Sequence, residues 1–293
     1  MKTSKHVPFL FIFPGFLLLI VFTYYPMFSA FYHSLFNWTI VESSFVGLHN
    51  YVELFHSNTF LISLKNMTIF VILSTIFITV MAIIGGELVF NYKPKKLSSV
   101  WKYLFILPMV VPFSVGMLIW TFIYLPYNGI LWQFLTSIGL GNLAIPWLGL
   151  PSTALIAVIF VGFPFLSSLQ FLIILSSLQN LDSSVLESSI LDGCSTFKRI
   201  LKIDLPLIMD KIFLIILLTA IGGAQVAASM LILTNGGPGN STMVPGLYIY
   251  QTAFNQSRYG YSSAAGVVLM FITLGMVLLI EVVESSLRRR VEQ

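Results

Sequence analysis

The sequence carries very few charged residues. Only 9% of its 293 residues are Asp, Glu, Lys or Arg, whereas 57% are hydrophobic, and the mean hydropathy is +0.92. Soluble domains usually contain about 25% charged residues, so this chain lacks the polar side chains to cover a globule of its size. Lipid can solvate such an apolar surface, provided that the backbone pairs its own polar groups. The composition therefore excludes an ordinary soluble protein and predicts a membrane protein.

Cysteine and several motifs that carry chemistry are also missing. Cys194 is the single cysteine, so an intrachain disulfide is excluded. The sequence contains no Cys-x-x-Cys pair, no His-Glu-x-x-His motif of a metalloprotease and no Gly-x-x-x-x-Gly-Lys-[Ser/Thr] nucleotide-binding loop. We therefore expect no metal, no cofactor and no catalytic centre on this chain. Any ATP that drives it must be bound by another chain.

What the sequence does contain is six apolar stretches, each long enough for a helix of about 20 residues that crosses a bilayer. They predict an all-α membrane protein with one transmembrane domain over 1–293 and spans at 8–32, 62–90, 103–125, 151–178, 212–234 and 263–284. The first stretch is expected to be an uncleaved span, because 27–30 (Met-Phe-Ser-Ala) is a poor signal-peptide cleavage site. Pro108, Pro112 and Pro164 predict kinks in the third and fourth spans.

The basic residues are distributed very unevenly between the connections. All but two of the 15 Lys and Arg residues lie in the regions that share one side of the membrane with both termini, and the exceptions are Lys65 and Arg258. Lysine and arginine accumulate on the cytoplasmic side of membrane proteins. Both termini are therefore expected in the cytoplasm, with outer loops at about 30–60, 126–150 and 235–262. The net charge of +4 then reflects topology, and no nucleic-acid binding is expected.

Charged residues are missing from the centres of the predicted spans. Glu87, Glu281 and Glu284 lie near the cytoplasmic ends, and Lys65 lies near an outer end. Proton-coupled carriers need ionisable groups at the membrane midplane, so this class is disfavoured. A self-contained channel or an ion-coupled carrier is the alternative class of protein, and it predicts transport without an ATPase.

The long cytoplasmic loop between the fourth and fifth spans has the pattern of two short helices joined by a turn. Ser184 and Glu187 have the spacing of a capping box at the start of the first helix. Gly193 suits the left-handed conformation that ends a helix. A second helix is expected over 195–202, and Pro206 suits the start of the next helix. The pattern predicts a helix-turn-helix with exposed apolar groups, and an amphipathic connector lying on lipid is the alternative.

The same loop, 179–211, carries a spaced pattern that resembles a known family. The pattern consists of Glu187, Ser188, Ser189, Gly193, Ile203, Leu205 and Pro206. It resembles the EAA loop of the membrane subunits of bacterial ABC importers, with serines in place of two alanines. Segments 45–51, 233–242 and 248–254 are similar to those of permeases related to the maltose and glycerol-phosphate importers.

The resemblance implies a function and a set of partners. The loop would dock into a cytoplasmic ABC ATPase dimer, which holds ATP and Mg²⁺, with Gly193 forming the turn and Phe197 filling a cleft. The residues implied in this coupling are Glu187, Ser188, Ser189, Asp192, Gly193, Phe197, Ile203, Leu205 and Pro206. A second homologous permease would complete a heterodimer in the bacterial plasma membrane, and an extracellular solute-binding protein would deliver a sugar or oligosaccharide. Another polar solute, such as glycerol phosphate, is the alternative cargo.

The resemblance also implies a transport path lined by the third to fifth spans. The implied residues are Gly162, Phe165, Leu169, Gln170, Gly222, Gly223, Gln225 and Val226. Amides and aromatic rings suit the hydroxyls and the C–H faces of sugars. Small residues equally suit close helix packing, so the residues alone leave both interpretations open.

Overall fold

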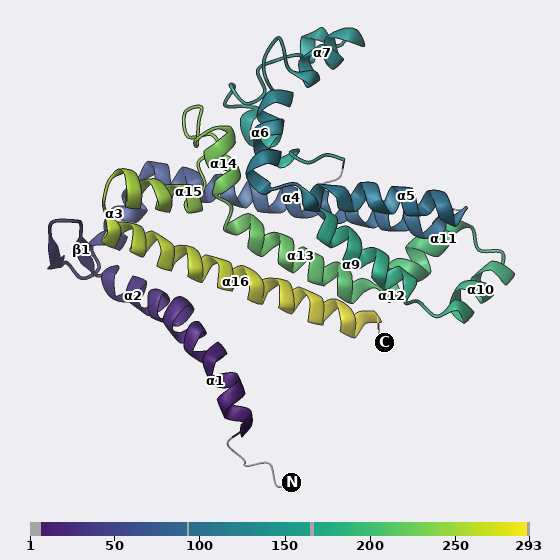
Figure 1. Ribbon diagram of the computed structural model, residues 1–293, viewed down its shortest axis with the longest axis horizontal. Helices are drawn as coiled ribbons and strands as arrows, with labels where there is room; N and C mark the ends of the chain where they lie inside the picture. Colours follow the sequence, from purple (N-terminus) through teal and green to yellow (C-terminus); the bar gives the residue numbers. More distant parts are fainter. Residues whose placement is uncertain (1–6, 93, 165–166, 292–293) are drawn as a thin grey trace. The chain divides into compact units, whose positions relative to one another are not determined.

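The structure is a computed structural model that describes residues 7–92, 94–164 and 167–291 (Figure 1). The described chain is mainly helical and contains one two-stranded sheet. It divides into two compact units. The first comprises Met1–Leu61 and Tyr248–Ile272, and the second comprises Ile62–Leu247 and Thr273–Gln293.

The first unit combines the N-terminal helices, a hairpin and the approach to the last helix. Its elements are, in chain order, α1 (Val7–Leu19), the π-helical η1 (Ile20–Tyr24), α2 (Tyr25–His33), β1 (Phe36–Trp38), β2 (Ser43–Phe45), α3 (His49–His56), α15 (Pro245–Tyr250), the π-helical η5 (Gln251–Asn255) and α16 (Tyr259–Val291). The helix α15 begins in the second unit, and α16 continues into it. The strands pair antiparallel, with Phe36 opposite Phe45.

The backbone of the hairpin region contacts both α3 and the start of α16. Asn50 Nδ2 on α3 donates hydrogen bonds to the carbonyl oxygens of Ser34 and Phe36, at 2.8 and 2.9 Å. A Cβ atom at Gly260, in the first turn of α16, would collide with the carbonyl oxygen of Phe36. Only glycine permits this close approach of α16 to β1.

The second unit contains most of the remaining helices. Its elements are α4 (Asn58–Asn91), which starts in the first unit, α5 (Lys95–Ile106), the 3₁₀ turn η2 (Leu107–Val110), α6 (Phe113–Ile123), α7 (Ile130–Ser137), the 3₁₀ turn η3 (Gly141–Leu143), α8 (Ala154–Ile159), α9 (Ser168–Gln179), α10 (Ser183–Leu191), α11 (Thr196–Arg199), the π-helical η4 (Ile200–Asp204), α12 (Leu205–Leu207), α13 (Met209–Ala224) and α14 (Ala228–Leu233).

The expected third and fourth spans are interrupted helices. The helical segments before and after Pro112 differ in direction by 103°, and Pro112 itself is extended (φ −55°, ψ 136°). Between α8 and α9 the described chain leaves the helical conformation around Gly162, whose φ is +93°, and Pro164. The predicted disturbances at Pro112 and Pro164 are confirmed as full breaks, whereas Pro108 lies within η2. Proline cannot donate to the helical ladder and restricts the residue before it.

The expected fifth span is also interrupted, although no proline marks the place. The helix α13 ends at Ala224 and α14 begins at Ala228. Between them Ala227 has φ −143° and ψ −47°, outside the helical region. This break was not predicted, because a run of small apolar residues reads as a helix-packing surface.

Among the described residues, three helical stretches are long and apolar enough to cross a membrane, namely Phe11–His33, Asn58–Asn91 and Tyr259–Leu287. The count reaches six if each of three bent helix pairs forms one span. Membrane-spanning helices are therefore present, and the number of six spans stays a prediction.

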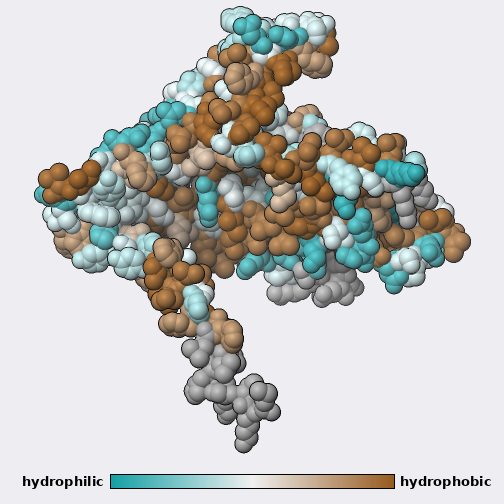
Figure 2. All heavy atoms as spheres, viewed as in Figure 1, coloured by the Kyte–Doolittle hydropathy of each residue, from teal (hydrophilic) through white to brown (hydrophobic). Residues whose placement is uncertain are grey.

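The core of the second unit lies where α4, α9 and α13 meet. Ala82, Ile174, Leu178, Ile212 and Ile215 are buried together at this point. Other large apolar side chains stay exposed, and Figure 2 shows how they gather along α6. Burial of apolar side chains holds the three core helices together, while the exposed ones need lipid or a partner chain.

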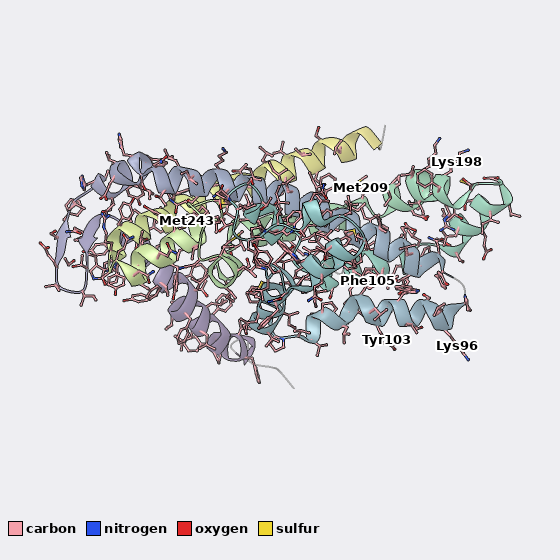
Figure 3. All side chains as sticks on the ribbon, turned by 90° about the horizontal axis from the view of Figure 1, so that it is seen from above. Lys96, Tyr103, Phe105, Lys198, Met209 and Met243 are labelled. Atoms are coloured by element: carbon pink, nitrogen blue, oxygen red, sulfur yellow. The ribbon has the colours of Figure 1, made fainter. Side chains whose placement is uncertain are left out.

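The ends of the second unit differ in character. Figure 3 places Lys96, at the start of α5, and Lys198, on α11, at the same end of this unit, whereas Met243 lies toward the other end. Segments far apart in the sequence therefore bring their basic residues to one end.

Candidate connecting segment and transport cavity

The chain between α9 and α13 folds into short helices, which we call the connecting segment (183–207). Its first helix, α10, is capped by Asp182, whose Oδ1 accepts a hydrogen bond from the Ser184 backbone N–H at 2.9 Å. The capping box predicted for Ser184 and Glu187 is therefore wrong, because Asp182 already caps the helix two residues earlier. This hydrogen bond holds the pKa of the Asp182 carboxyl below its usual value.

The turn after α10 has the predicted left-handed conformation. Gly193 has φ +68°, and the Cys194 N–H donates to the Ser189 carbonyl at 3.0 Å. This pattern is that of a helix C-terminus closed by glycine. The Ser195 hydroxyl then accepts from the Lys198 N–H at 3.4 Å and caps α11. Capped ends on both sides give the turn a defined geometry.

The second half of the segment is longer than predicted. The helical course runs through α11, η4 and α12 to Leu207, past the expected end at Lys202. The next long helix begins at Met209, after Ile208 has left the helical region, and not at Pro206. Pro206 lies in α12, which continues directly from η4.

Large apolar side chains of the connecting segment are exposed. The exposed fractions are 64% for Ile190, 87% for Leu191, 72% for Phe197 and 51% for Leu201. The remaining predicted coupling residues are arranged as follows: Glu187, Ser188, Asp192, Gly193 and Pro206 are exposed, Ile203 and Leu205 are half-buried, and Ser189 is buried. Such a cluster of exposed apolar groups beside polar ones is typical of a docking surface.

A cavity of about 300 Å³, which we call the central cavity, lies among α4, α8, α9 and α13. Four of the residues predicted for the transport path line it together, namely Gln170, Gly222, Gly223 and Val226. Its other lining residues are Phe70, Ser74, Ile78, Val158, Ile159, Val161, Leu218, Thr219 and Ser229. The lining combines hydroxyls, one amide and aromatic and aliphatic surface, and it carries no charged side chain among the described residues.

The amide of Gln170 is held at both ends. Its Nε2 donates to Thr219 Oγ1 at 3.1 Å, across from α9 to α13, and its Oε1 accepts from the Ser167 hydroxyl. The Thr219 hydroxyl in turn donates to the Ile215 carbonyl at 2.7 Å. Gln170 therefore links two helices as well as lining the cavity.

The two neighbouring glycines of α13 differ in their surroundings. A Cβ atom at Gly223 would lie 3.2 Å from Val71 Cγ2, so this residue lets α13 pack closely against α4. A Cβ atom at Gly222 would meet nothing within 4 Å. Gly223 therefore packs against α4 as well as lining the cavity, whereas Gly222 lines the cavity without such a contact.

The other predicted path residues lie elsewhere. Gly162 lines a separate cavity of about 850 Å³, formed mainly by α5, η2 and α6. Leu169 and Gln225 are exposed and line none of these cavities. Phe165 lies outside the described residues. The structure therefore brings together only part of the predicted path within this chain.

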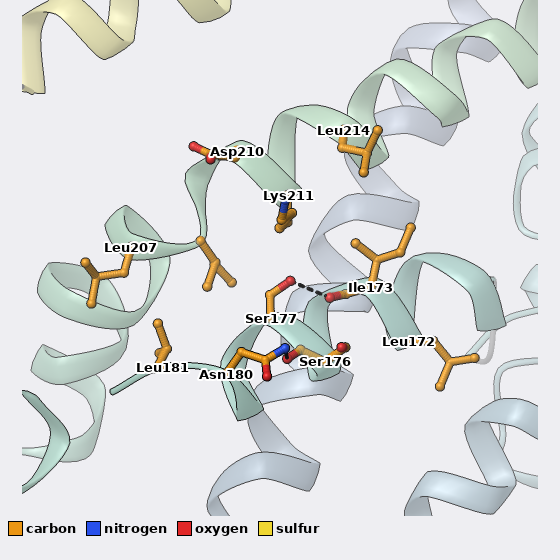
Figure 4. A pocket seen from close by; sticks show the side chains of 11 residues that line it. Leu172, Ile173, Ser176, Ser177, Asn180, Leu181, Leu207, Asp210, Lys211 and Leu214 are labelled. Atoms are coloured by element: carbon orange, nitrogen blue, oxygen red, sulfur yellow. Dashed lines mark hydrogen bonds between the residues drawn. The ribbon is translucent and has the colours of Figure 1, made fainter. Parts of the chain in front are cut away.

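A third cavity, of about 550 Å³, opens between α9 and the helices α12 and α13 (Figure 4). Lys211, Asp210 and Asn180 line its polar part, and Leu172 and Leu214 line its apolar part. Asn180 Nδ2 donates to the Ser176 carbonyl at 2.9 Å. This cavity lies beside the connecting segment, between the helices that enter and leave it.

Several lining residues of the central cavity were missed in the sequence. Thr219 lies one helical turn before Gly222 and Gly223, so the period of the helix could have identified it. Phe70 and Ser74 lie on α4, whose sequence is apolar on all sides and gives no sign of which face lines a cavity.

Known proteins match this chain over nearly its whole length. Residues 78–289 match the family described as binding-protein-dependent transport system inner membrane component. YurN of Bacillus subtilis, described as a "probable ABC transporter permease protein", is 33% identical over 278 residues, which are 94% of this chain and 95% of the relative. MsmF of Streptococcus mutans, a multiple sugar-binding transport system permease protein, is 29% identical over 273 residues, 91% and 90% of the two chains.

The fold has a counterpart of known structure. It matches a chain in the crystal structure of a bacterial ABC transporter involved in the import of the acidic polysaccharide alginate, with a TM-score of 0.84. The sequence identity is 20%, and the match covers 96% of this chain and 95% of the other. At 20% identity, this similarity is evidence for a shared fold alone.

Proposed function

The chain belongs to the family of binding-protein-dependent transport system inner membrane components, and we propose that it is one permease of an ATP-driven importer for a sugar or oligosaccharide. It is a transport subunit of the inner membrane. A separate ATPase dimer supplies the energy, a second homologous permease completes the path, and a solute-binding protein delivers the cargo.

The observation that carries this proposal is the exposed apolar surface of the connecting segment. Phe197, Ile190 and Leu191 project from short helices whose turn is fixed by Gly193. A large exposed aromatic side chain on a defined scaffold is the type of residue that anchors a protein interface. The segment resembles the EAA loop, so we assign this surface to the ATPase, with ATP and Mg²⁺ held by that partner.

The proposed orientation follows from the basic residues. Lys96 and Lys198 share one end of the second unit (Figure 3), and basic residues accumulate on the cytoplasmic side. The connecting segment and both termini then face the cytoplasm, and six spans cross the plasma membrane. The residues 126–150 face outward, toward the binding protein.

The central cavity fits the proposed cargo. Ser74, Thr219 and Gln170 offer hydroxyl and amide groups, and Phe70 offers an aromatic face. Sugars combine hydroxyls with apolar C–H faces that such a lining can meet. The relative MsmF is a sugar permease by its description. The cavity holds no described cationic side chain, which favours a neutral sugar over a phosphorylated solute.

Replacement of Phe197 tests the docking surface. Phe197→Ala is expected to weaken ATPase binding about thirtyfold and so to lower the amount of ATPase that co-purifies with the permease pair, because an aromatic anchor contributes about 2 kcal/mol or more at an interface. ATP-dependent sugar uptake should fall with it. Tyr127→Ala is the matched control for ATPase co-purification, since Tyr127 is 74% exposed and lies outside the segment. Unchanged co-purification of Phe197→Ala would rule out the assigned surface.

A further inference from the structure

A buried polar cluster joins the connecting segment to the end of α4. Arg199, the last residue of α11, donates from Nε to Asp204 Oδ2 at 3.0 Å. Its Nη2 donates to Asn91 Oδ1, on the last residue of α4. Asn91 Nδ2 donates to Glu87 Oε2 at 2.8 Å and to the Glu87 carbonyl at 2.9 Å. One guanidinium thus connects three parts of the fold.

The cluster is deeply buried for a group of charged residues. The side chain of Asp204 is completely buried, that of Arg199 is 12% exposed, and Glu87 is 5% exposed. Glu87 Oε1 and Asp204 Oδ1 have no hydrogen-bond partner among the described residues. A buried ion pair often contributes no more stability than apolar residues of the same volume. Stability alone therefore gives a poor reason for this cluster.

The geometry of the cluster favours transmission of movement. The guanidinium is planar and donates in two fixed directions, so it resists rotation of one partner against the other. It also lies over the ring of Phe90, 5.9 Å from the ring centre. Phe197, two residues before Arg199, belongs to the exposed docking surface. Movement of the ATPase at Phe197 therefore reaches Arg199 within one helical turn.

The helix α4 connects this polar cluster to the central cavity. The helix α4 contributes Phe70, Ser74 and Ile78 to the lining of the central cavity. Asn91 and Ile78 lie on the same helix, separated by about 20 Å at the helical rise of 1.5 Å per residue. The helix is unbroken between these residues, so a displacement of its end is transmitted to the cavity wall. The covalent route through α12 and α13 reaches the same cavity at Leu218, Thr219 and Gly222.

We infer that Arg199 is a positioning residue, which clamps the connecting segment to α4 so that ATPase movement displaces both α4 and α13 around the central cavity. This inference rests on the proposed function of the connecting segment. The side chain touches neither substrate nor nucleotide, and it acts through Asn91 and Asp204.

The test compares a single and a double variant in the complete reconstituted importer. Arg199→Met leaves Asp204 buried without its partner, so less assembled protein is expected. Arg199→Met combined with Asp204→Leu removes both members of the buried ion pair and leaves Glu87 hydrogen-bonded to Asn91, so the amount of assembled complex should recover. In both variants the sugar transported per ATP hydrolysed should fall about tenfold, within the usual range of coupling between distant sites. A purely structural role predicts normal coupling in the double variant, and that result would overturn the inference.

A distance measurement between α4 and α11 tests the proposed clamp directly. Spin labels at Leu88→Cys on α4 and Thr196→Cys on α11, with Cys194→Ser, report the separation of the two elements through the ATP cycle of the complete importer. The separation should stay constant in the protein with Arg199 and should change or broaden in Arg199→Met. A separation that varies equally in both proteins would contradict the clamp.

The Phe197 experiment separates the two proposals. If Phe197→Ala retains the ATPase, the function assigned to the connecting segment fails. If Phe197→Ala loses the ATPase while the double variant keeps normal transport per ATP, only the role of Arg199 is overturned.

Discussion

At the scale of single residues, Gly222 and Gly223 show how neighbours on one helix can serve different purposes. Gly223 allows α13 to approach Val71 on α4, whereas the space beside Gly222 is open. Both glycines stand in one run of small residues, so their sequence context is nearly the same. The two differ in what an added Cβ atom would meet, which is Val71 on α4 at Gly223 and open space at Gly222.

This difference gives a paired prediction. Gly223→Leu should overpack the contact with α4, which costs about 1–3 kcal/mol, and should lower the yield of folded protein. Gly222→Leu should fold normally but reduce sugar uptake, because its side chain enters the cavity. Yield and thermal unfolding measure the first effect, and uptake per assembled complex measures the second. Equal behaviour of the two variants would refute the assignment.

Glu53 and Arg258 form an ion pair in the first unit. Arg258 Nη2 donates to Glu53 Oε2 at 2.6 Å, and this hydrogen bond is the main reason that the pKa of Glu53 lies below its usual value. The same bond raises the pKa of Arg258. Both side chains are more than one third exposed, so solvent screening limits the gain to below about 1 kcal/mol.

The lowered pKa of Glu53 predicts that the stability of the folded protein depends on pH. A carboxyl whose pKa is depressed by folding adds stability above its unfolded pKa, and this stability is lost as the pH falls through the folded pKa. Thermal unfolding of the permease should therefore be slightly more sensitive to acid below about pH 4.5 than that of Glu53→Gln. Glu42→Gln, in the same unit, is the control and should behave like the unchanged protein.

At the scale of elements, the breaks in the middle helices show what the sequence could reveal. Proline predicted the interruptions near Pro112 and Pro164, because its chemistry limits the backbone wherever it occurs. The break between α13 and α14 contains Gln225, Val226 and Ala227, which are all compatible with a helix. Tertiary packing determines that break, and a single sequence carries no local sign of it.

The sequence likewise predicted some features of the connecting segment and missed others. Gly193 marked the turn correctly, because its left-handed conformation has a clear residue preference. The cap at Asp182 and the continuation to Leu207 were missed, because several neighbouring residues can cap a helix and π-helical turns have no simple pattern. The cavity lining on α4 was missed, since an apolar helix in a membrane is apolar on every face.

The turn at Gly193 provides a prediction with a close control. Gly193→Val forces a β-branched residue into φ +68°, which costs about 1–2 kcal/mol, so the turn and the position of Phe197 should change. Gly139 has φ +81° and is equally open, and Gly139→Val carries similar strain outside the segment. Uptake and ATPase co-purification should fall for Gly193→Val only. Equal losses in both variants would show that general strain, and not the turn, is responsible.

At the scale of the whole molecule, the distribution of basic residues leads to a prediction of topology. Single cysteines at Asn128 and Ser184, in a Cys194→Ser background, report the two sides of the membrane. A membrane-impermeant maleimide added to intact cells should label Asn128→Cys and spare Ser184→Cys, because 126–150 is assigned outside and the connecting segment inside. The reverse pattern would invert the orientation and separate the connecting segment from any cytoplasmic ATPase.

The central claim is that this chain transports a sugar only as part of an ATP-driven assembly. The most direct measurement is uptake of radiolabelled oligosaccharides into proteoliposomes that contain this chain with its partner permease, ATPase and sugar-loaded binding protein. The account predicts uptake that requires ATP and the ATPase, and that is lost in Phe197→Ala. Uptake at the same rate by this chain without the ATPase would contradict the account and identify a channel or carrier instead.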